Sequence, residues 1–286
     1  EEVIYAQIVK DLTEALASDI PNTQWEYAVG RSSKAAINAL LGQVYLSMAS
    51  TLSAGSQQNL QLAEQHLAAA YALRTFGKLN EIPYADVFDV SKKSSNKELI
   101  FQVQYLQGDQ NYSSNIARNN QARDETINSR FRSTGVGTRA SLDLVKAYEE
   151  QDLRKEFSVK FASSSQVSDW FITKFRDNSE AAGTEGRGGN DWILIRYADV
   201  MLLLAETKMK LGKDAEAIVL IDEVRERAGL SSYAEARKNA SYNSLYPTLK
   251  DALLQERRVE LAFENHRWFD LIRNYNSQEL VTYFKG

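Results

Sequence analysis

Residue types that build particular kinds of site are missing or scarce in this sequence. Cysteine is absent, and there are only 2 histidines among 286 residues. The first absence excludes disulfides, thiolate metal sites and a cysteine nucleophile. The second argues against a histidine-centred metal site or catalytic triad, because His66 and His266 lie far apart and each would need convergent partners. We expect each to be a hydrogen-bonded histidine at a helix end.

Charge and hydropathy argue against two further kinds of partner. The chain has 34 basic and 38 acidic residues, a net charge of −4 and no basic block, so it lacks the electrostatic footprint of a nucleic-acid-binding protein. The longest apolar stretch, residues 200–205, is far shorter than the ~20 residues of a membrane-spanning helix. The glycine-rich residues 183–189 lack the Gly-Lys-Ser/Thr of a P-loop, which favours a flexible connector over a phosphate cradle. No cofactor is predicted.

The most strongly patterned part of the sequence is residues 190–275. The run from Trp192 to Thr207 is apolar on nearly every face around residues 201–205, which predicts a buried helix. A second, amphipathic run has small or apolar residues at three- and four-residue steps and closes at Gly229, typical of a helix end. Together they predict a helical hairpin of the tetratricopeptide (TPR) kind, whose small residues let two helices approach closely. A further helix is expected over 249–263.

The rest of the chain contains more helices and one region of different character. Helical periods over 3–16, 35–49 and 60–73 predict three helices, the second capped by serines at 32–33 and paired with the third. Residues 98–105 favour a strand, 141–150 a helix, and 157–161 with 170–175 a hairpin around serines 163–165. Residues 106–138 have no period. An irregular segment of this length is usually functional or disordered.

Three segments of this chain resemble the C-terminal signature of the SusD/RagB family. They are LIRYADVMLLLAE at 194–206, IDEVRERAG at 221–229 and QERRVELAFENHRWFDLIR at 255–273. Their order and spacing match as well as their residues. Shorter likenesses extend the resemblance toward the N-terminus: GRSSKAAI at 30–37, ELIF at 98–101 and LDLVKAY at 142–148.

The resemblance implies a fold and an architecture. We expect an α-rich protein with minor β structure, a single SusD-like domain over 1–286. TPR-like helices would occupy about 1–76 and 190–275, and a loop-rich, ligand-facing insertion about 77–189. The chain begins at Glu1 without a methionine or an apolar signal region. Family members carry a secretion signal, a lipidated cysteine and further helices upstream, so we expect this chain to be the C-terminal half or more of a member.

The resemblance also implies a function. Family members are surface-exposed outer-membrane lipoproteins of Bacteroidetes-type bacteria that capture nutrients, usually glycans. They pass them to a SusC-like TonB-dependent transporter without catalysis. The expected partners are therefore an oligosaccharide or polysaccharide and that transporter, with no nucleic acid, and with membrane attachment only through a lipid anchor that this sequence does not contain. An intracellular TPR adaptor for protein partners and a helical glycoside hydrolase remain as alternatives.

Aromatic side chains are the natural candidates for a glycan site, because sugars present apolar C–H faces beside their hydroxyls. Tyr112 stands in the irregular segment beside Asn111, with Arg118 following, and Trp170 lies near the expected hairpin tip. These four residues are the predicted ligand contacts, with ordinary surface or packing aromatics left open as the alternative. Aromatics in the periodic helices are expected in the core: Tyr45, Tyr71, Trp192, Tyr197, Trp268 and Phe269.

Two pairs of acidic residues bear on catalysis. Asp199 and Glu206 share a helix face, as do Glu260 and Glu264, and a glycosidase needs two carboxylates on either side of its scissile bond. Arginines accompany both pairs, at 196 before the first and at 257 and 267 around the second. Because an unpaired buried charge is costly, we interpret these acids as members of structural ion pairs.

Overall fold

The computed structural model describes residues 2–26, 30–52, 55–123, 126–128, 131–132, 137–163 and 167–285. Helices dominate, and each strand belongs to a small antiparallel pair. The α-helices are α1 (Glu2–Leu16), α2 (Lys34–Thr51), α3 (Ser56–Ala72), α4 (Ile116–Asn120), α5 (Leu142–Ala147), α6 (Leu153–Ser158), α7 (Glu180–Glu185), α8 (Tyr197–Lys210), α9 (Asp214–Arg227), α10 (Tyr233–Ala236), α11 (Ala240–Leu245), α12 (Leu249–Glu260), α13 (Arg267–Asn274) and α14 (Ser277–Lys285). Short 3-10 helices are η1 (Gln24–Glu26), η2 (Leu79–Glu81) and η3 (Tyr84–Val87). The strands are β1 (Leu99–Val103), β2 (Thr126–Asn128), β3 (Phe131–Arg132), β4 (Val159–Ser163), β5 (Ser168–Ile172) and β6 (Trp192–Arg196).

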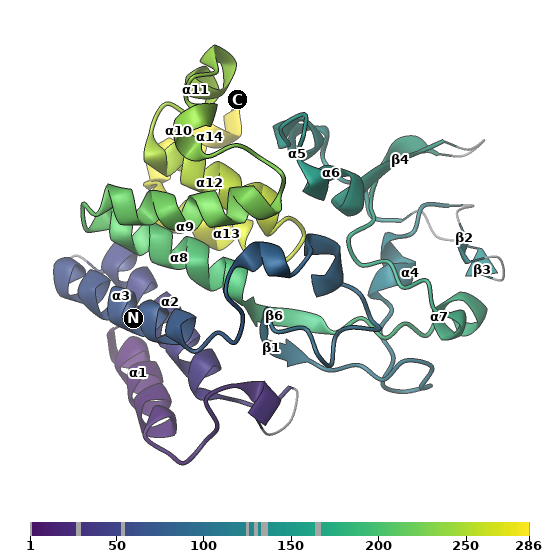
Figure 1. Ribbon diagram of the computed structural model, residues 1–286, viewed down its shortest axis with the longest axis horizontal. Helices are drawn as coiled ribbons and strands as arrows, with labels where there is room; N and C mark the ends of the chain where they lie inside the picture. Colours follow the sequence, from purple (N-terminus) through teal and green to yellow (C-terminus); the bar gives the residue numbers. More distant parts are fainter. Residues whose placement is uncertain are drawn as a thin grey trace.

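Two antiparallel helical pairs form the helical body, which we define as α1–α3 with α8–α14 (Figure 1). Helix α2 packs along α3, and α8 packs along α9. Ser33 begins α2 as predicted, its side chain accepting from the Ala36 N–H. A Cβ on Gly42 would lie only 2.4 Å from Leu67 Cγ, so this glycine permits the close approach of α2 and α3 that the TPR-like pattern predicted.

Helix α8 lies at the centre of this body, as its composition predicted. Every residue from Tyr197 to Thr207 is buried, and the main hydrophobic cluster joins it to α2, α3 and α9. The prediction was wrong at the beginning of the run, because residues 192–196 form strand β6, paired antiparallel with β1. A short apolar run fits a buried strand as well as a helix, so periodicity could not decide. The partner strand decides it, and α8 begins only at Tyr197.

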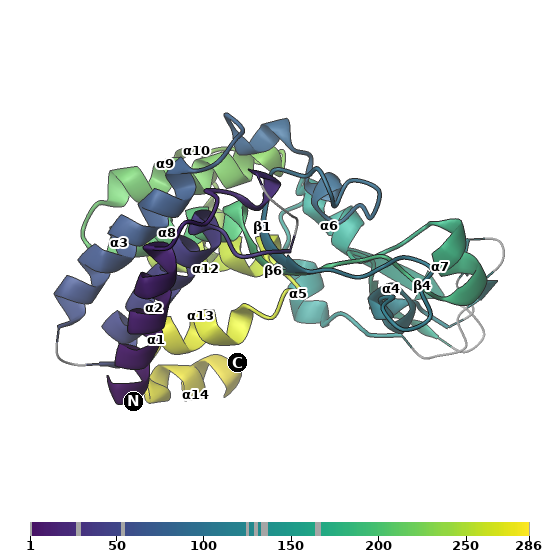
Figure 2. The ribbon, with the colours of Figure 1, turned by 90° about the horizontal axis from the view of Figure 1, so that it is seen from below.

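Residues 77–189, which the sequence analysis expected to be an insertion, carry α4–α7 and strands β1–β5. We call them the insertion 77–189. Figures 1 and 2 show α4, α7 and β4 projecting to one side of the helical body, with β1 and β6 between. The predicted hairpin is present as β4 and β5, in an unbroken register that places Phe161 opposite Trp170. Part of its serine turn, residues 164–166, lies outside the described ranges. The segment expected to be irregular contains α4, β2 and β3, with 124–125, 129–130 and 133–136 undescribed.

Two further expectations about the C-terminal helices were wrong. Helix α12 ends at Glu260 rather than at 263, because Phe263 and Asn265 adopt positive φ angles of 68° and 66°, which a helix cannot continue through. Trp268 and Phe269 on α13 are 55% and 57% exposed instead of buried. Periodicity identifies an apolar face but cannot say whether a neighbour covers it. In the described part of the chain, no helix combines the length and apolarity needed to cross a bilayer.

Candidate functional site

The C-terminal signature builds a buried charge network between the helical body and the insertion 77–189. The Arg196 guanidinium donates to Glu98 at 2.7 Å, to Glu260 at 2.6 Å and to both carboxylate oxygens of Glu264 at 2.8 Å. Arg227 donates to Glu98 and Glu260. These residues come from β6, the segment before β1, α9 and the end of α12, so the network joins segments remote in sequence. Further members are Asp152, Arg154, Lys174, Arg225 and Glu256.

The environment keeps these carboxylates ionised. Burial alone would raise the pKa of Glu260, but the Arg227, Arg196 and Arg154 guanidiniums outweigh it and hold that pKa well below its usual range. Burial would also raise the pKa of Glu264, but Arg196 and Lys174 outweigh it and lower that pKa to about 2. A glycosidase acid needs a raised pKa and access to substrate. Glu260 and Glu264 have neither, being 0% and 6% exposed.

A second network contains the other predicted acidic pair. Arg257 contacts Asp199 at 2.9 Å and Asp270 at 2.8 Å, and Arg273 contacts Glu206 at 2.9 Å. The interpretation of these acids as members of ion pairs is therefore confirmed, with different partners from those that proximity in sequence suggested. Arg196 pairs with the 260 and 264 carboxylates rather than with Asp199, and Arg267 donates to the Leu254 carbonyl and the Tyr283 hydroxyl.

Both histidines have structural surroundings. His66 Nδ1 lies 2.9 Å from Asn38 Oδ1, and its ring stacks on Tyr45. It lies within α3 rather than at a helix end, whereas His266 directly precedes α13, as expected. Across the described ranges no group of three His, Cys, Asp or Glu side chains could hold a metal ion.

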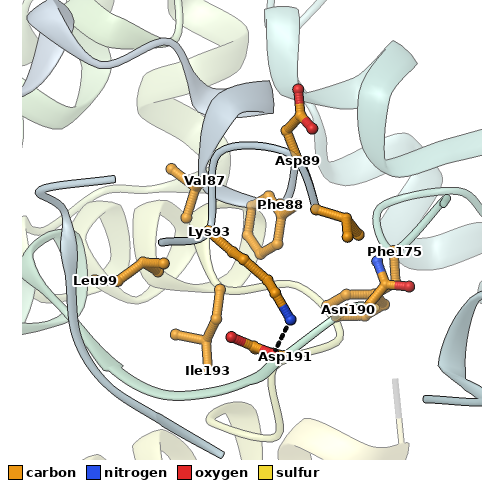
Figure 3. A pocket seen from close by; sticks show the side chains of 10 residues that line it. Val87, Phe88, Asp89, Lys93, Leu99, Phe175, Asn190, Asp191 and Ile193 are labelled. Carbon is orange, nitrogen blue, oxygen red and sulfur yellow. Dashed lines mark hydrogen bonds and ion pairs between the residues drawn. The ribbon is translucent and has the colours of Figure 1, made fainter. Parts of the chain in front are cut away.

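A polar anchor holds the base of the segment that follows β1. The Lys93 ammonium donates to Asp191 at 2.7 Å and to the Gly189 carbonyl at 2.8 Å. Asp191 also accepts from Gln102 and from the Tyr105 N–H, each at 2.8 Å. Figure 3 shows the Lys93 side chain ending at Asp191, among the apolar side chains that surround the pair. Residues 93, 102, 105 and 191 therefore fix where the chain leaves the β1–β6 ribbon.

Beyond this anchor the chain forms a closed loop that displays Tyr112. The Leu106 N–H donates to the Tyr112 carbonyl at 2.8 Å, and the Asp109 carboxylate accepts the N–H groups of Asn111 and Tyr112 at 2.7 and 2.9 Å. These two backbone donors hold the pKa of Asp109 below its ordinary value. The side chain of Tyr112 is 69% exposed. The structure thus brings Asn111 and Tyr112 together on one turn, with Arg118 exposed on α4 nearby in sequence.

The glycine-rich residues are hydrogen-bonded to neighbouring segments of the fold, rather than forming the flexible connector that was predicted. Gly188 and Ser114 exchange backbone hydrogen bonds at 2.7 and 3.0 Å, and the Gly189 N–H donates to Asp177 at 2.7 Å. A Cβ on Gly189 would lie 2.7 Å from Val90. The close packing requires glycine here, and the N–H groups that a phosphate cradle would need are already donating to protein atoms.

A cleft of about 420 Å³ opens beside the loop that carries Tyr112. Phe88 and Phe157 supply apolar walls, while Gln107, from the Tyr112 loop, and Asp177 supply polar groups. The Gln107 amide donates to the Ser179 hydroxyl at 2.7 Å and to Asp177 at 3.2 Å, which orients it in the wall. The sequence analysis did not predict this cleft, because its walls come from residues 85–91, 107, 157 and 176–179, which are remote from one another in sequence.

Trp170 occupies a different place from the Tyr112 loop. It lies in the middle of β5 rather than near the hairpin tip, and its ring meets Phe161 edge to face at 5.7 Å. The indole is half-buried against the cluster around Val145 and Val259. Phe161 itself is 46% exposed. The hairpin therefore presents an aromatic pair, of which Trp170 is the inner member.

Comparison with known proteins shows what this chain is similar to. Residues 158–286 match the sequence profile of the SusD family. SusD-like protein P2 of Formosa agariphila is 27% identical over 296 residues, which cover 96% of this chain and 56% of that protein. The profile match covers the C-terminal part of the chain, and the relative is similar over nearly all of it, in agreement with the resemblance seen in the sequence.

Solved structures support the same fold. A laminarin-binding SusD-like protein superposes with a TM-score of 0.73 at 24% identity, covering 98% of this chain and 63% of that one. A protein solved with xylogluco-oligosaccharide superposes with a TM-score of 0.76 at 20% identity, covering 100% and 59%. This chain thus spans between 56% and 63% of the three proteins compared.

Proposed function

We propose that this chain captures a glycan at the cell surface without catalysis, as part of an outer-membrane lipoprotein that delivers its ligand to a SusC-like TonB-dependent transporter. The proposal is carried by similarity to SusD-like proteins, through the profile match over residues 158–286 and the likeness of nearly the whole chain to one such protein. Two solved proteins of this fold bind or contain glycans, laminarin in one and xylogluco-oligosaccharide in the other. The helical pairs alone would also suit a protein adaptor, so the similarity to SusD-like proteins favours glycan capture over that alternative.

The insertion 77–189 is the proposed ligand-facing region. Its loop presents Tyr112 as an exposed ring on a backbone held by Asp109, so little conformational freedom is lost when a sugar stacks on it. Asn111 and Arg118 can hydrogen-bond sugar hydroxyls, and Trp170 contributes through its pair with Phe161. The adjoining cleft has a volume typical of small-ligand sites and combines apolar walls with a few oriented polar groups.

Non-catalytic capture is the form of activity that the acidic residues favour. Both predicted acidic pairs are buried and engaged by arginines. Hydrolysis by them would require a carboxylate that reaches the glycosidic bond. Incubation with oligosaccharides should therefore release no product, and product formation would contradict this part of the proposal.

Replacing Tyr112 tests the binding role. In calorimetric titrations with oligosaccharides prepared from laminarin and from xyloglucan, Tyr112→Ala should weaken binding at this site about tenfold, because one stacking platform is lost. Trp268→Ala is the matched control, since it removes another exposed aromatic, from α13 in the helical body. Unchanged affinity in Tyr112→Ala removes this residue from the site, and no binding by the intact chain contradicts the proposed function.

A further inference from the structure

A second cavity, of about 400 Å³, lies outside the proposed site. One wall is the turn between α5 and α6, which carries Glu150 and Gln151. The other is the segment from Leu230 through α11, which carries Ser241 and Tyr246. The cleft beside Tyr112 shares no lining residue with it. The cavity and the cleft lie toward opposite ends of α6, since Gln151 precedes this helix and Phe157 is near its end. At a helical rise of 1.5 Å per residue, these two residues are roughly 9 Å apart along the helix axis.

Buried Arg225 fixes the two walls relative to each other. Its guanidinium donates to Glu149 on one wall at 2.8 Å and to the Ser231 carbonyl on the other at 2.7 Å. The Leu153 N–H adds a backbone bond to the Ala228 carbonyl at 3.1 Å. Arg225 is 1% exposed, so these bonds are shielded from water. The cavity is therefore a constructed feature of the fold rather than a gap between mobile loops.

The lining offers an aromatic platform beside unused polar groups. Tyr246 is half-buried and meets Tyr242 edge to face at 5.1 Å, which sets the orientation of its ring. Four polar side chains of the lining make no hydrogen bond to the described part of the protein: the Tyr246 hydroxyl, the Gln151 amide, the Ser241 hydroxyl and the Glu150 carboxylate. They supply both donors and acceptors. Leu245, 68% exposed, extends the apolar surface at the edge.

The charges of the lining favour a neutral ligand. Arg225 already neutralises Glu149, and the two remaining charged side chains, Lys146 and Glu150, have opposite signs. A cationic amine would find no surplus carboxylate, and an anion no surplus cation. A ring with an apolar C–H face and many hydroxyls matches what is present, because it can stack on Tyr246 while its hydroxyls meet the free polar groups.

We propose that this cavity is a second carbohydrate-binding site, for a neutral oligosaccharide, in addition to the site proposed around Tyr112. The assignment rests on the proposed function in taking glycans as the ligand. It goes beyond that function in assigning two independent sites to one chain. Tyr246 is the stacking residue, and Gln151, Glu150 and Ser241 recognise hydroxyls.

The experiment fills the cavity without disturbing the core. Ser241→Trp places a bulky ring in it from an exposed position, and Ser244→Trp, also exposed on α11 but outside the lining, is the matched control. Each variant is titrated calorimetrically with the laminarin and xyloglucan oligosaccharides, alone and combined with Tyr112→Ala. The wild type and Ser244→Trp should bind two equivalents, and Ser241→Trp one. In the Tyr112→Ala variant, the binding event that keeps its full affinity should be lost with Ser241→Trp and weakened about tenfold by Tyr246→Ala, while the event already weakened by Tyr112→Ala persists.

The possible failures are distinguishable. One equivalent in the wild type, unchanged by Ser241→Trp and weakened by Tyr112→Ala, overturns the second site while the proposed function stands. Equal loss in Ser241→Trp and Ser244→Trp also overturns it, because the effect would then not depend on filling the cavity. Absence of binding by every protein, wild type included, contradicts the proposed function itself.

Discussion

Acidic residues have different partners in the helical body and in the insertion 77–189. In the body, buried arginines meet glutamates and aspartates from remote helices, as Arg257 of α12 meets Asp199 of α8. In the insertion, aspartates mostly accept backbone N–H groups, as Asp109 does from Tyr112 and Asp177 from Gly189. Charge pairs among packed helices fix relative positions in the interior, whereas backbone acceptors shape single turns and leave neighbouring side chains exposed. The body therefore buries its charged residues in pairs between helices, and the insertion leaves side chains such as Tyr112 exposed.

The largest expected effect follows from breaking the buried network around Glu260. Glu260→Gln leaves Arg196, Arg227 and Arg154 partly uncompensated in the interior, so the free energy of unfolding should fall by about 3–5 kcal/mol. Denaturant unfolding followed by circular dichroism measures it. Glu14→Gln is the control, because Glu14 pairs with Lys10 at the surface and should change stability by less than about 1 kcal/mol. Equal stability of Glu260→Gln and wild type would show that the network is not needed.

Acid should lower the stability of the protein by protonating another carboxylate of this network, that of Glu264. Glu264 has a folded-state pKa of about 2 against an ordinary value of 4.5. A lowered folded-state pKa stabilises the protein above the unfolded-state pKa, and this stabilisation is lost as the pH falls from about 4.5 to 2. The loss should be on the order of 3 kcal/mol. Unfolding titrations at a series of pH values measure it, and Glu264→Gln should flatten the dependence. An identical slope in that variant would contradict the assignment.

A smaller, local effect is expected from the anchor of the insertion. Asp191→Ala removes the acceptor of Lys93, Gln102 and the Tyr105 N–H, which should cost about 1–3 kcal/mol. Hydrogen exchange should accelerate in residues 105–115 and remain unchanged in α8. Asp214→Ala, at the exposed start of α9, is the control. Acceleration spread equally over α8 would show that the two regions are not held independently.

Much of the helical body was predictable because burial and helical period reinforce each other there. The α8–α9 hairpin, the Ser33 cap and the close contact at Gly42 all follow from local pattern. The predictions failed where a neighbour decides the outcome. Residues 192–196 are a strand because β1 lies beside them, and Trp268 is exposed because the described residues of the chain leave its ring uncovered.

The candidate site shows the same division more sharply. Exposure of Tyr112 was predictable from an unpatterned, polar segment, whereas the turn that orients it depends on Asp109 and on bonds to residues 187–188. Neither hollow was predictable, because the lining residues of each are brought together only by folding. The second one, with Tyr246 and Gln151, lies in segments to which sequence reasoning had assigned no site.

By itself, the sequence determined the helical pairs, the buried α8 and the pairing of its acids with arginines, because these depend on composition and on short-range periodicity. The resemblance to the SusD/RagB family was also visible in the sequence, through three segments in order. Only the tertiary structure decided which arginine meets which carboxylate, where the strand ends and the helix begins, and where the two cavities open. Those outcomes depend on contacts between residues tens to more than a hundred positions apart, and no local pattern encodes such contacts.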